Sequence, residues 1–462
     1  MKSNNCYLVT DYGAVGDQQT LNTKFIQQTI DLVAQKGGGV VVIPPGQYLT
    51  GTIFLPSKTV LEIQSGAVLI ASPDLKDYPP LEHGHNKDRQ PYHLIVLDQV
   101  EDVWIRGGGR IEGSGQEFWY PRVGPGARPG NYHWYREREK RVSPLIEVVR
   151  SRKIKLQDIT ITNSPGWTCH FHCCQSVQIN RIRIYNHKFG PNTDGLDING
   201  CRDVLISDCQ IETGDDAIVL KTTPDSHSCE RVTISNCILQ SNCVALKLGA
   251  KESYHDIREI TISNCIVHHS NRVLGLYSLN GGNFEGITVN NIVGNTDNGM
   301  FLTLPIHFDL RRNNHGAGKI SHVQISNFIA RGQGRVLLTA EAGTQLSNIF
   351  LRDIHLSYPG LEDAAELIDI LPSGSGTYSN NNPAARQTRA AFIAENVSNL
   401  FLDNLTVDWP EKSYRFDYYA FWGRNLRGGF LNLPLLRGFK GGDICCFDNC
   451  QLDYKQDVGR RV

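Results

Sequence analysis

A repeat of nearly constant length constrains this chain more than any other feature. The pattern is apolar–x–Ile/Val–x–Asn/Asp–apolar–x–apolar, as in VLISDCQIE and VTISNCILQ. Its clearest copies begin at positions 204, 232, 260 and 287, which are 28, 28 and 27 residues apart. One such unit is too small to bury its own apolar face, so consecutive units must stack as a solenoid. The pattern predicts an all-β, single-domain parallel β-helix. Propellers need longer blades, and leucine-rich repeats need a different signature.

The two ends of the chain differ from the repeats. Residues 20–36 have apolar positions at roughly helical spacing, and GGG follows them, so we expect an N-terminal helix that caps the solenoid. We expect the whole chain, 1–462, to be one domain. Residues 1–60 would form the cap and first strands, 60–410 the coils, and 410–462 a C-terminal tail packed on the coils.

Cysteines in one phase of the repeat predict an inward ladder of thiols. Cys209, Cys237 and Cys265 share this phase, and we expect Asn290 to occupy it on the next coil. The chain has 13 cysteines, an odd number without paired C-x-x-C spacing, which favours reduced structural thiols over disulfides or a zinc site.

The overall charge is nearly balanced. Lys and Arg number 46 against 47 Asp and Glu, which gives no support to a nucleic-acid or membrane-surface role. No apolar run approaches the roughly 20 residues that span a bilayer. The first residues contain no apolar signal region, so we expect a cytoplasmic location; a trimmed sequence would look the same.

A long excursion interrupts the repeats at residues 113–142. It is rich in aromatic residues and arginine, which suit contacts with sugars. It could therefore form a wall of a groove, or it could equally pack on itself.

Four aspartates lie in two short segments that are otherwise apolar. NTDGLDINGC and ETGDDAIVLK contain Asp194, Asp197, Asp215 and Asp216. The repeat aligns DGLDI with DAIVL, and aligned residues on adjacent coils stack about 4.8 Å apart. We therefore predict that Asp194 lies beside Asp216, with Asp215 next to both. Asp197 has a different phase and is expected to be structural.

Stacked like charges have an electrostatic consequence. Closely spaced carboxylates cannot all ionise easily, so at least one should keep its proton to unusually high pH. A protonated acid beside ionised ones is what glycoside hydrolysis needs. Turn capping, Ca²⁺ binding and simple solvation are the structural alternatives. Chemistry is favoured because a like-charged trio stabilises a fold poorly.

The acid-bearing segments resemble the active-site core of the polygalacturonases, glycoside hydrolase family 28. The resemblance also includes DYGAVGDQQTLNTKFIQQTID, SGAVLIASPDLKDYP and NSPGWTCHFHCC, and so extends over most of the chain. It implies a right-handed parallel β-helix and an inverting hydrolase of pectic chains that needs no metal or other cofactor. Asp215 would be the general acid, and Asp194 and Asp216 would activate water. Asn192 and His170 match positions close to the sugar.

The sequence departs from the family at two motifs. Val244 stands where the family has the His of Gly-His-Gly, and the stretch from Gly275 to Tyr277 stands where it has Arg-Ile-Lys. The latter motif holds the galacturonate carboxylate, so its loss favours a neutral sugar there, as in relatives that act on rhamnogalacturonan. Lys247 and Tyr277 are the substrate contacts that we predict in this region, and Arg272 lies near enough in sequence to contribute.

Three functions are compatible with these features. The leading hypothesis is an inverting glycosidase that acts on a pectin-like or related acidic oligosaccharide or polysaccharide, from chain ends. A lyase or epimerase on the same solenoid would need a base and usually Ca²⁺. A non-catalytic carbohydrate-binding β-helix is the third.

Overall fold

The computed structural model of this chain describes residues 6–82, 86–120, 136–296, 303–313, 316–358, 388–409, 419–433, 435–437 and 444–455. By their contacts the residues divide into two compact units. The first unit is Met1–Val219 with Asp225–Ile238, and the second is Leu220–Pro224 with Leu239–Val462. The single domain that the sequence suggests stays a prediction.

The first unit is built from three parallel sheets, because each strand pairs with the corresponding strand of the next coil. Sheet A contains β5 (Ile53–Phe54), β8 (Ile95–Asp98), β13 (Ile146–Val149), β16 (Cys169–His172) and β19 (Leu196–Asn199). Sheet B contains β1 (Cys6–Leu8), β3 (Gly39–Ile43), β6 (Thr59–Ile63), β9 (Glu101–Arg106), β14 (Arg152–Gln157), β17 (Gln175–Asn180), β20 (Arg202–Ser207) and β23 (Cys229–Ser235). Sheet C contains β2 (Asp17–Leu21), β4 (Gly46–Thr50), β7 (Ala67–Ala71), β10 (Arg110–Glu112), β15 (Thr160–Thr162), β18 (Arg183–Tyr185) and β21 (Gln210–Thr213).

The second unit continues the same parallel pairing with longer strands. One series is β25 (Val244–Ser253), β27 (Arg272–Ser278), β29 (Leu304–Leu310), β33 (Val336–Ala340), β35 (Ala390–Asp408), β36 (Tyr419–Asn432) and β38 (Cys445–Asp448). A second series is β26 (Ile257–Val267), β28 (Asn283–Thr296), β32 (Lys319–Gly332) and β34 (Leu346–Ser357), which then pairs with β35. The predicted right-handed parallel β-helix is confirmed. The described strands within 410–462 also pair in parallel with strands of these series. They are β36, β37 (Leu435–Arg437), which pairs with β35, β38, and β39 (Gln451–Lys455), which pairs with β36.

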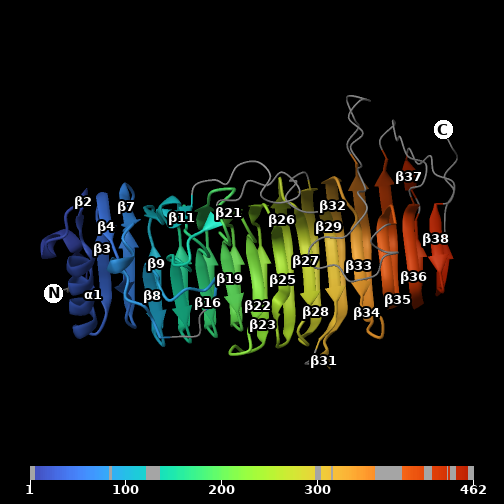
Figure 1. Cartoon of the computed structure of the whole chain (residues 1–462), viewed down its shortest axis with the longest axis horizontal. Helices are drawn as coiled ribbons and strands as arrows, with labels where there is room; N and C mark the ends of the chain where they lie inside the picture. The colour runs from blue at the N-terminus through green and yellow to red at the C-terminus, as the bar shows by residue number, and fades with distance from the viewer. Residues whose placement is uncertain are drawn as a thin grey trace. The chain divides into compact units, whose positions relative to one another are not determined.

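The predicted N-terminal helix is α1, Thr23–Gln35. It is the one α-helix among the described residues, and in Figure 1 it lies against the first strands at the N-terminal end. Ile26, Ile30 and Val33 form its buried face, which contacts β3 and β5. The helix therefore covers apolar groups that an open first coil would expose to water. No described helix has the length and apolar character that crossing a membrane requires.

Apolar residues that face the core pair with each other from one coil to the next. In sheet A, Val148, Phe171 and Ile198 are partners on successive coils, and all are fully buried. The cysteines of the repeat are also buried. The expected place of Asn290 is wrong, because Cys265 lies opposite Ile292 while Asn290 lies opposite Ser263. Ile292 holds the inward phase, since an unpaired amide there would be costly.

The Asn of the repeat has a left-handed backbone conformation inside the long strands β26, β28 and β32. Asn264, Asn291 and Asn327 all have positive φ values, of 55°, 54° and 51°. Asparagine tolerates this left-handed conformation better than most residues. The amide of Asn291 donates to Asn264 (2.9 Å), and that of Asn327 donates to Asn291 (3.0 Å). These asparagines thus form a ladder of side-chain amides along the coils.

Candidate active site

Two hydrogen bonds define how the acid-bearing coils align. The Gly195 amide donates to the Asp216 carbonyl (2.9 Å), and the Leu196 amide donates to the Ala217 carbonyl (3.0 Å). In a parallel ladder these bonds place Asp194 and Asp216 at the same level on neighbouring coils. This is the register that the repeat predicts. Asp194 and Asp216 are buried, whereas Asp215, in the bend directly before Asp216, is partly exposed.

The turns that carry the acids are tied to each other. The Gly214 amide donates to Thr193 Oγ1 (3.0 Å), and Thr193 Oγ1 donates to the Gly190 carbonyl (3.2 Å). A Cβ added at Gly214 would lie 2.6 Å from both the Gly190 carbonyl oxygen and Thr193 Oγ1. Only a residue without a side chain permits this approach, so Gly214 holds the turn before Asp215 against the turn before Asp194.

A buried arginine that the sequence did not single out supports the first of these turns. Arg141 Nη1 donates to the carbonyls of Pro191 (2.7 Å) and Pro165 (3.1 Å), and Nη2 donates to Asn192 Oδ1 (3.4 Å). Trp119 Nε1 also donates to the Pro165 carbonyl (2.8 Å). The side chain of Asn192, a predicted substrate residue, is therefore held by Arg141. Its backbone has a left-handed conformation, with a φ of 50°.

Arg141 and Trp119 belong to the aromatic excursion. Trp119 lies in β11 (Trp119–Tyr120), which pairs antiparallel with β12 (Arg136–Glu137). Its buried ring would clash with a Cβ at Gly190, at 2.7 Å. The described parts of the excursion thus pack against the coils near the acids. Residues 121–135 lie outside the described part, so the groove wall stays a prediction.

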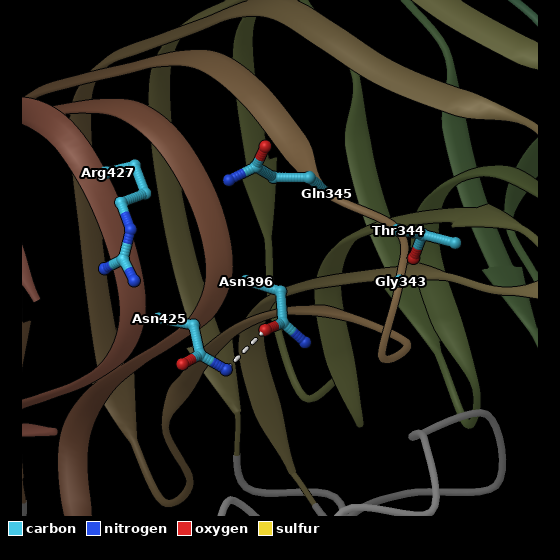
Figure 2. A pocket seen from close by; sticks show the side chains of 6 residues that line it. All are labelled: Gly343, Thr344, Gln345, Asn396, Asn425 and Arg427. Atoms are coloured by element: carbon cyan, nitrogen blue, oxygen red, sulfur yellow. Dashed lines mark hydrogen bonds between the residues drawn. The ribbon is translucent and has the colours of Figure 1, made fainter. Parts of the chain in front are cut away.

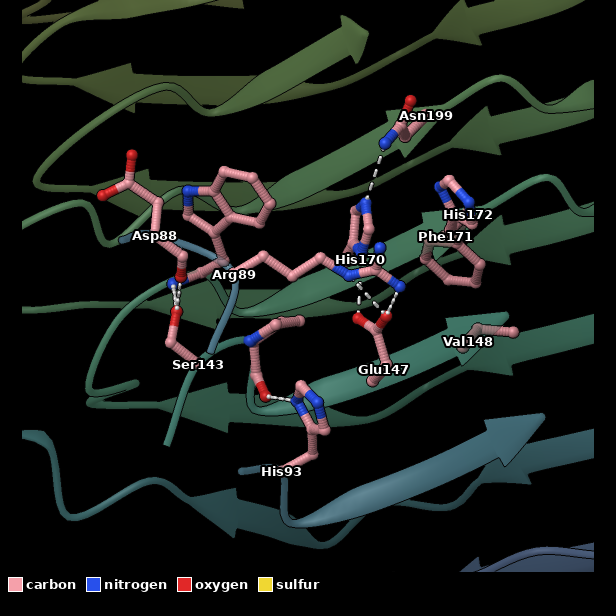
Figure 3. A network of polar contacts seen from close by, with 12 residues as sticks. Asp88, Arg89, His93, Ser143, Glu147, Val148, His170, Phe171, His172 and Asn199 are labelled. Atoms are coloured by element: carbon pink, nitrogen blue, oxygen red, sulfur yellow. Dashed lines mark hydrogen bonds and ion pairs between the residues drawn. The ribbon is translucent and has the colours of Figure 1, made fainter. Parts of the chain in front are cut away.

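His170 belongs to a fully buried polar network in sheet A (Figure 3). Its Nδ1 lies 2.8 Å from Glu147 Oε2, and its Nε2 lies 3.3 Å from Asn199 Nδ2. Arg89 binds the other oxygen of Glu147, through Nε at 2.9 Å and also through Nη2. His170 therefore links the carboxylate of Glu147 to the side-chain amide of Asn199. A direct contact between His170 and a sugar stays a prediction.

Electrostatics explain how Glu147 can remain buried. Burial alone would raise the pKa of the Glu147 carboxyl, but His170 and Arg89 outweigh burial and hold this pKa well below its usual range. Asp197 lies opposite His170 in the register. It is fully buried within sheet A, and its structural role stays a prediction.

The other predicted substrate residues, Lys247 and Tyr277, belong to the second unit. Lys247 lies opposite Gly275 in the register, and the Tyr277 ring covers Gly275. A Cβ added at Gly275 would lie 2.5 Å from the Tyr277 hydroxyl oxygen. Arg272 Nη1 donates to this hydroxyl (3.3 Å), and burial, with a smaller opposing effect of Arg272, raises the pKa of Tyr277 to about 12. The contribution of Lys247 and Tyr277 to a site with the acids stays a prediction.

A pocket of about 350 Å³ lies elsewhere in the second unit (Figure 2). It is lined by Gly343, Thr344, Gln345, Asn396, Asn425 and Arg427. The Asn425 amide donates to Asn396 Oδ1 (2.9 Å), and Arg427 Nη2 donates to Asn449 Oδ1 (2.9 Å). Much of the polar lining is thus engaged in the ladder between coils, and none of the predicted site residues lines this pocket.

Comparison with known families shows which family this chain belongs to. The sequence profile of glycosyl hydrolases family 28 matches residues 41–370. This chain belongs to that family. A second profile, of rhamnogalacturonase A/epimerase, pectate lyase-like proteins, matches residues 7–72 at the N-terminal end.

Individual relatives resemble the chain over part of their length. A probable polygalacturonase of Vitis vinifera is 32% identical over 230 residues, which are 47% of this chain and 45% of that protein. The chain spans about half the length of the curated relatives it matches.

Solved structures agree on the fold. An exopolygalacturonase from Thermotoga maritima has a TM-score of 0.64 at 20% identity and covers 76% of this chain and 87% of that one. A family 28 exopolygalacturonase from Yersinia enterocolitica has a TM-score of 0.68 at 16% identity and covers 90% and 77%. At such identities the likeness concerns the fold alone.

Sequence reasoning missed Arg141, Glu147 and Arg89. Glu147 had a usable signal, because a lone carboxylate inside the apolar segment LIEVV must be paired when buried. Arg141 ends the charged run REREKR, and no pattern there distinguishes the buried arginine from its exposed neighbours.

Proposed function

We propose that this chain is an inverting glycoside hydrolase that acts on pectin-like or related acidic glycans. The observation that carries the proposal is the alignment of Asp194 with Asp216, with Asp215 at the edge of the pair. Membership of glycosyl hydrolases family 28 supports the same reaction class.

The exposure of the three acids suggests their roles. Asp215 is partly exposed, so it can reach the glycosidic oxygen and donate a proton to it as the bond breaks. Asp194 and Asp216 are buried and would take a proton from the attacking water. Water then adds to the anomeric carbon on the face opposite the leaving group, which inverts the configuration.

The substrate proposal rests on the second unit and on the names of relatives. Gly275 and the Tyr277 ring occupy the positions where the family motif has cations, so a carboxylate-bearing sugar would lose charge-assisted contacts there. We propose a neutral sugar, such as rhamnose or galactose, at that subsite, in a rhamnogalacturonan-type chain. Cleavage from chain ends is proposed because both solved structures described above are named exopolygalacturonases.

A panel of defined glycans tests the substrate class. We expect reducing ends to be released from rhamnogalacturonan oligosaccharides, one sugar unit or repeat at a time, and more slowly from polygalacturonate. Proton NMR of the first product should show the inverted anomer. A retained anomer, or an unsaturated product that disappears with chelator, would contradict the proposed reaction.

Asp215→Asn tests the proton donor. Loss of a general acid typically costs 10²–10⁴-fold in rate, so we expect kcat to fall by about that factor while the melting temperature stays near that of the wild type. Asp203→Asn is the control, since it removes an exposed carboxylate that pairs with Arg231 Nε (2.6 Å) in sheet B. Equal activity of the two variants on the best glycan would refute the assignment of Asp215.

A further inference from the structure

Arg141 is a buried cation whose position calls for an explanation. It lies between β12 and β13, and its side chain is among the largest that are fully buried in the described residues. Removing a guanidinium from water is costly, so a chain keeps such a group where several acceptors or charges compensate. The protein also makes room for it, because a Cβ at Gly166 would lie 3.2 Å from Arg141 Cζ.

The acceptors of Arg141 come from two successive coils. Pro165 belongs to the turn that precedes β16, and Pro191 belongs to the turn that precedes β19. One guanidinium therefore joins two turns, and the second of these continues directly into Asn192 and Asp194. The planar fork of arginine suits such a pair of acceptors, whereas lysine presents a single point charge.

The charge of Arg141 acts on the acids as well. Burial lowers the pKa of Arg141, and the carboxylates of Asp88, Glu137, Asp194 and Asp215 oppose this lowering. Asp88 Oδ1 lies 3.7 Å from Arg141 Nη2. Attraction between two charges is reciprocal, so the guanidinium also favours the charged state of the carboxylates around it.

We propose that Arg141 is a positioning residue of the active site. It fixes the Pro191–Asp194 turn against the Pro165 turn of the preceding coil, and Thr193 of the fixed turn accepts a hydrogen bond from the Gly214 amide. Its charge offsets part of the repulsion among the acids. This inference rests on the proposed function, because it assigns Arg141 a role in that same reaction. Arg141 itself contacts backbone carbonyls and Asn192 rather than reacting atoms.

Three substitutions at Arg141 separate its geometry from its charge. Arg141→Gln removes the charge and the fork, and we expect kcat to fall about 100-fold, the effect of a displacement of about 1 Å, with a smaller change in KM. Arg141→Lys keeps the charge and should lose less. Arg141→Ala should recover activity with added guanidinium chloride, and not with sodium chloride at equal ionic strength.

The pH profile gives a readout that a purely structural role would not change. Without the cation, the carboxylates nearby hold protons to higher pH. The acid limb of kcat against pH should therefore move to higher pH in Arg141→Gln and return toward the wild-type position in Arg141→Lys.

Arg335 supplies a matched control. It is equally buried in the second unit and donates from Nη1 to the Thr388 carbonyl. Arg335→Gln should lower the melting temperature and leave the pH profile unchanged. If Arg141→Gln behaves like Arg335→Gln, or guanidinium gives no recovery, the positioning role is refuted.

Hydrogen exchange distinguishes failure of this inference from failure of the proposed function. If the wild type hydrolyses no glycan, the proposed function fails, yet the clamp on the turns can still be measured. Amides of residues 190–196 and 212–217 should exchange faster in Arg141→Gln than in the wild type or in Arg335→Gln. Unchanged exchange in both segments would overturn the inference.

Discussion

The acid-bearing coils of the first unit and the coil of β27 in the second unit use the same strand ladder in different ways. Around Asp194, polar side chains from outside the coil, such as Arg141, reach in and hold the turn. Around Gly275, the missing side chain lets Tyr277 of the same strand cover the backbone. The same parallel ladder therefore supports a turn held by a buried guanidinium in the first unit and a backbone covered by an aromatic ring in the second.

This difference shows what varies in a solenoid. Inward positions repeat apolar residues on every coil, as Val148, Phe171 and Ile198 do. The other positions are free to diverge, because they do not fill the core. Function in such a fold is then set by the side chains that cover those positions.

Removing the Glu147 carboxylate should lower the stability of the first unit more than the other substitutions below. Glu147→Gln leaves Arg89 buried without its carboxylate partner, and breaking a buried pair costs about 3–5 kcal/mol. We expect a fall of that size in the free energy of unfolding, measured by denaturant titration.

A surface carboxylate in the same unit is the control for Glu147. Glu101 pairs with Lys153 (2.7 Å) and with Arg152 at the protein surface. Exposed pairs contribute little to stability. Glu101→Gln should therefore unfold close to the wild type, and a similar loss in both variants would argue against the buried network as the main support of sheet A.

Filling Gly275 tests the other side of the comparison. Gly275→Ala puts a Cβ 2.5 Å from the Tyr277 ring, which must move. Overpacking of this kind costs about 1–3 kcal/mol, so we expect the free energy of unfolding to fall by that amount. In a Tyr277→Ala background the same change should cost much less. Equal costs in the two backgrounds would show that contact with the Tyr277 ring does not cause the loss of stability.

The pH dependence of stability tests the buried polar network of the first unit in another way. Burial, followed by His170 and Arg89, lowers the pKa of His172 to about 3. The unfolded chain binds a proton near the usual histidine pKa of about 6.5, so the unfolded state gains protons first as the pH falls.

His172 therefore stabilises the fold fully above about pH 6.5, and this stabilisation is lost progressively between about pH 6.5 and pH 3. The slope reaches at most about 1.4 kcal/mol per pH unit. His172→Asn should flatten the stability curve in this interval, measured by denaturant titration at each pH. An unchanged slope would show that another group titrates there.

The sequence by itself determined the parts of this protein that depend on period. A repeat of about 28 residues specifies parallel coils, because aligned strands on successive coils must share one register to bury their apolar phase. From that register alone, the alignment of Asp194 with Asp216 followed. Counting within the repeat also has its limits, since Asn290 was placed in the wrong phase and Ile292 occupies it.

Only the tertiary structure decided which side chains cover the outward positions. Arg141 and Trp119 come from an excursion with no period, and both meet the Pro165 carbonyl. Tyr277 covers Gly275 through a ring orientation that no spacing encodes. Periodicity gives the phase of a residue along its strand, whereas the contacts of a buried polar group depend on segments far apart in sequence. Those contacts exist only once the coils have stacked, because only then does burial make an unpaired charge costly.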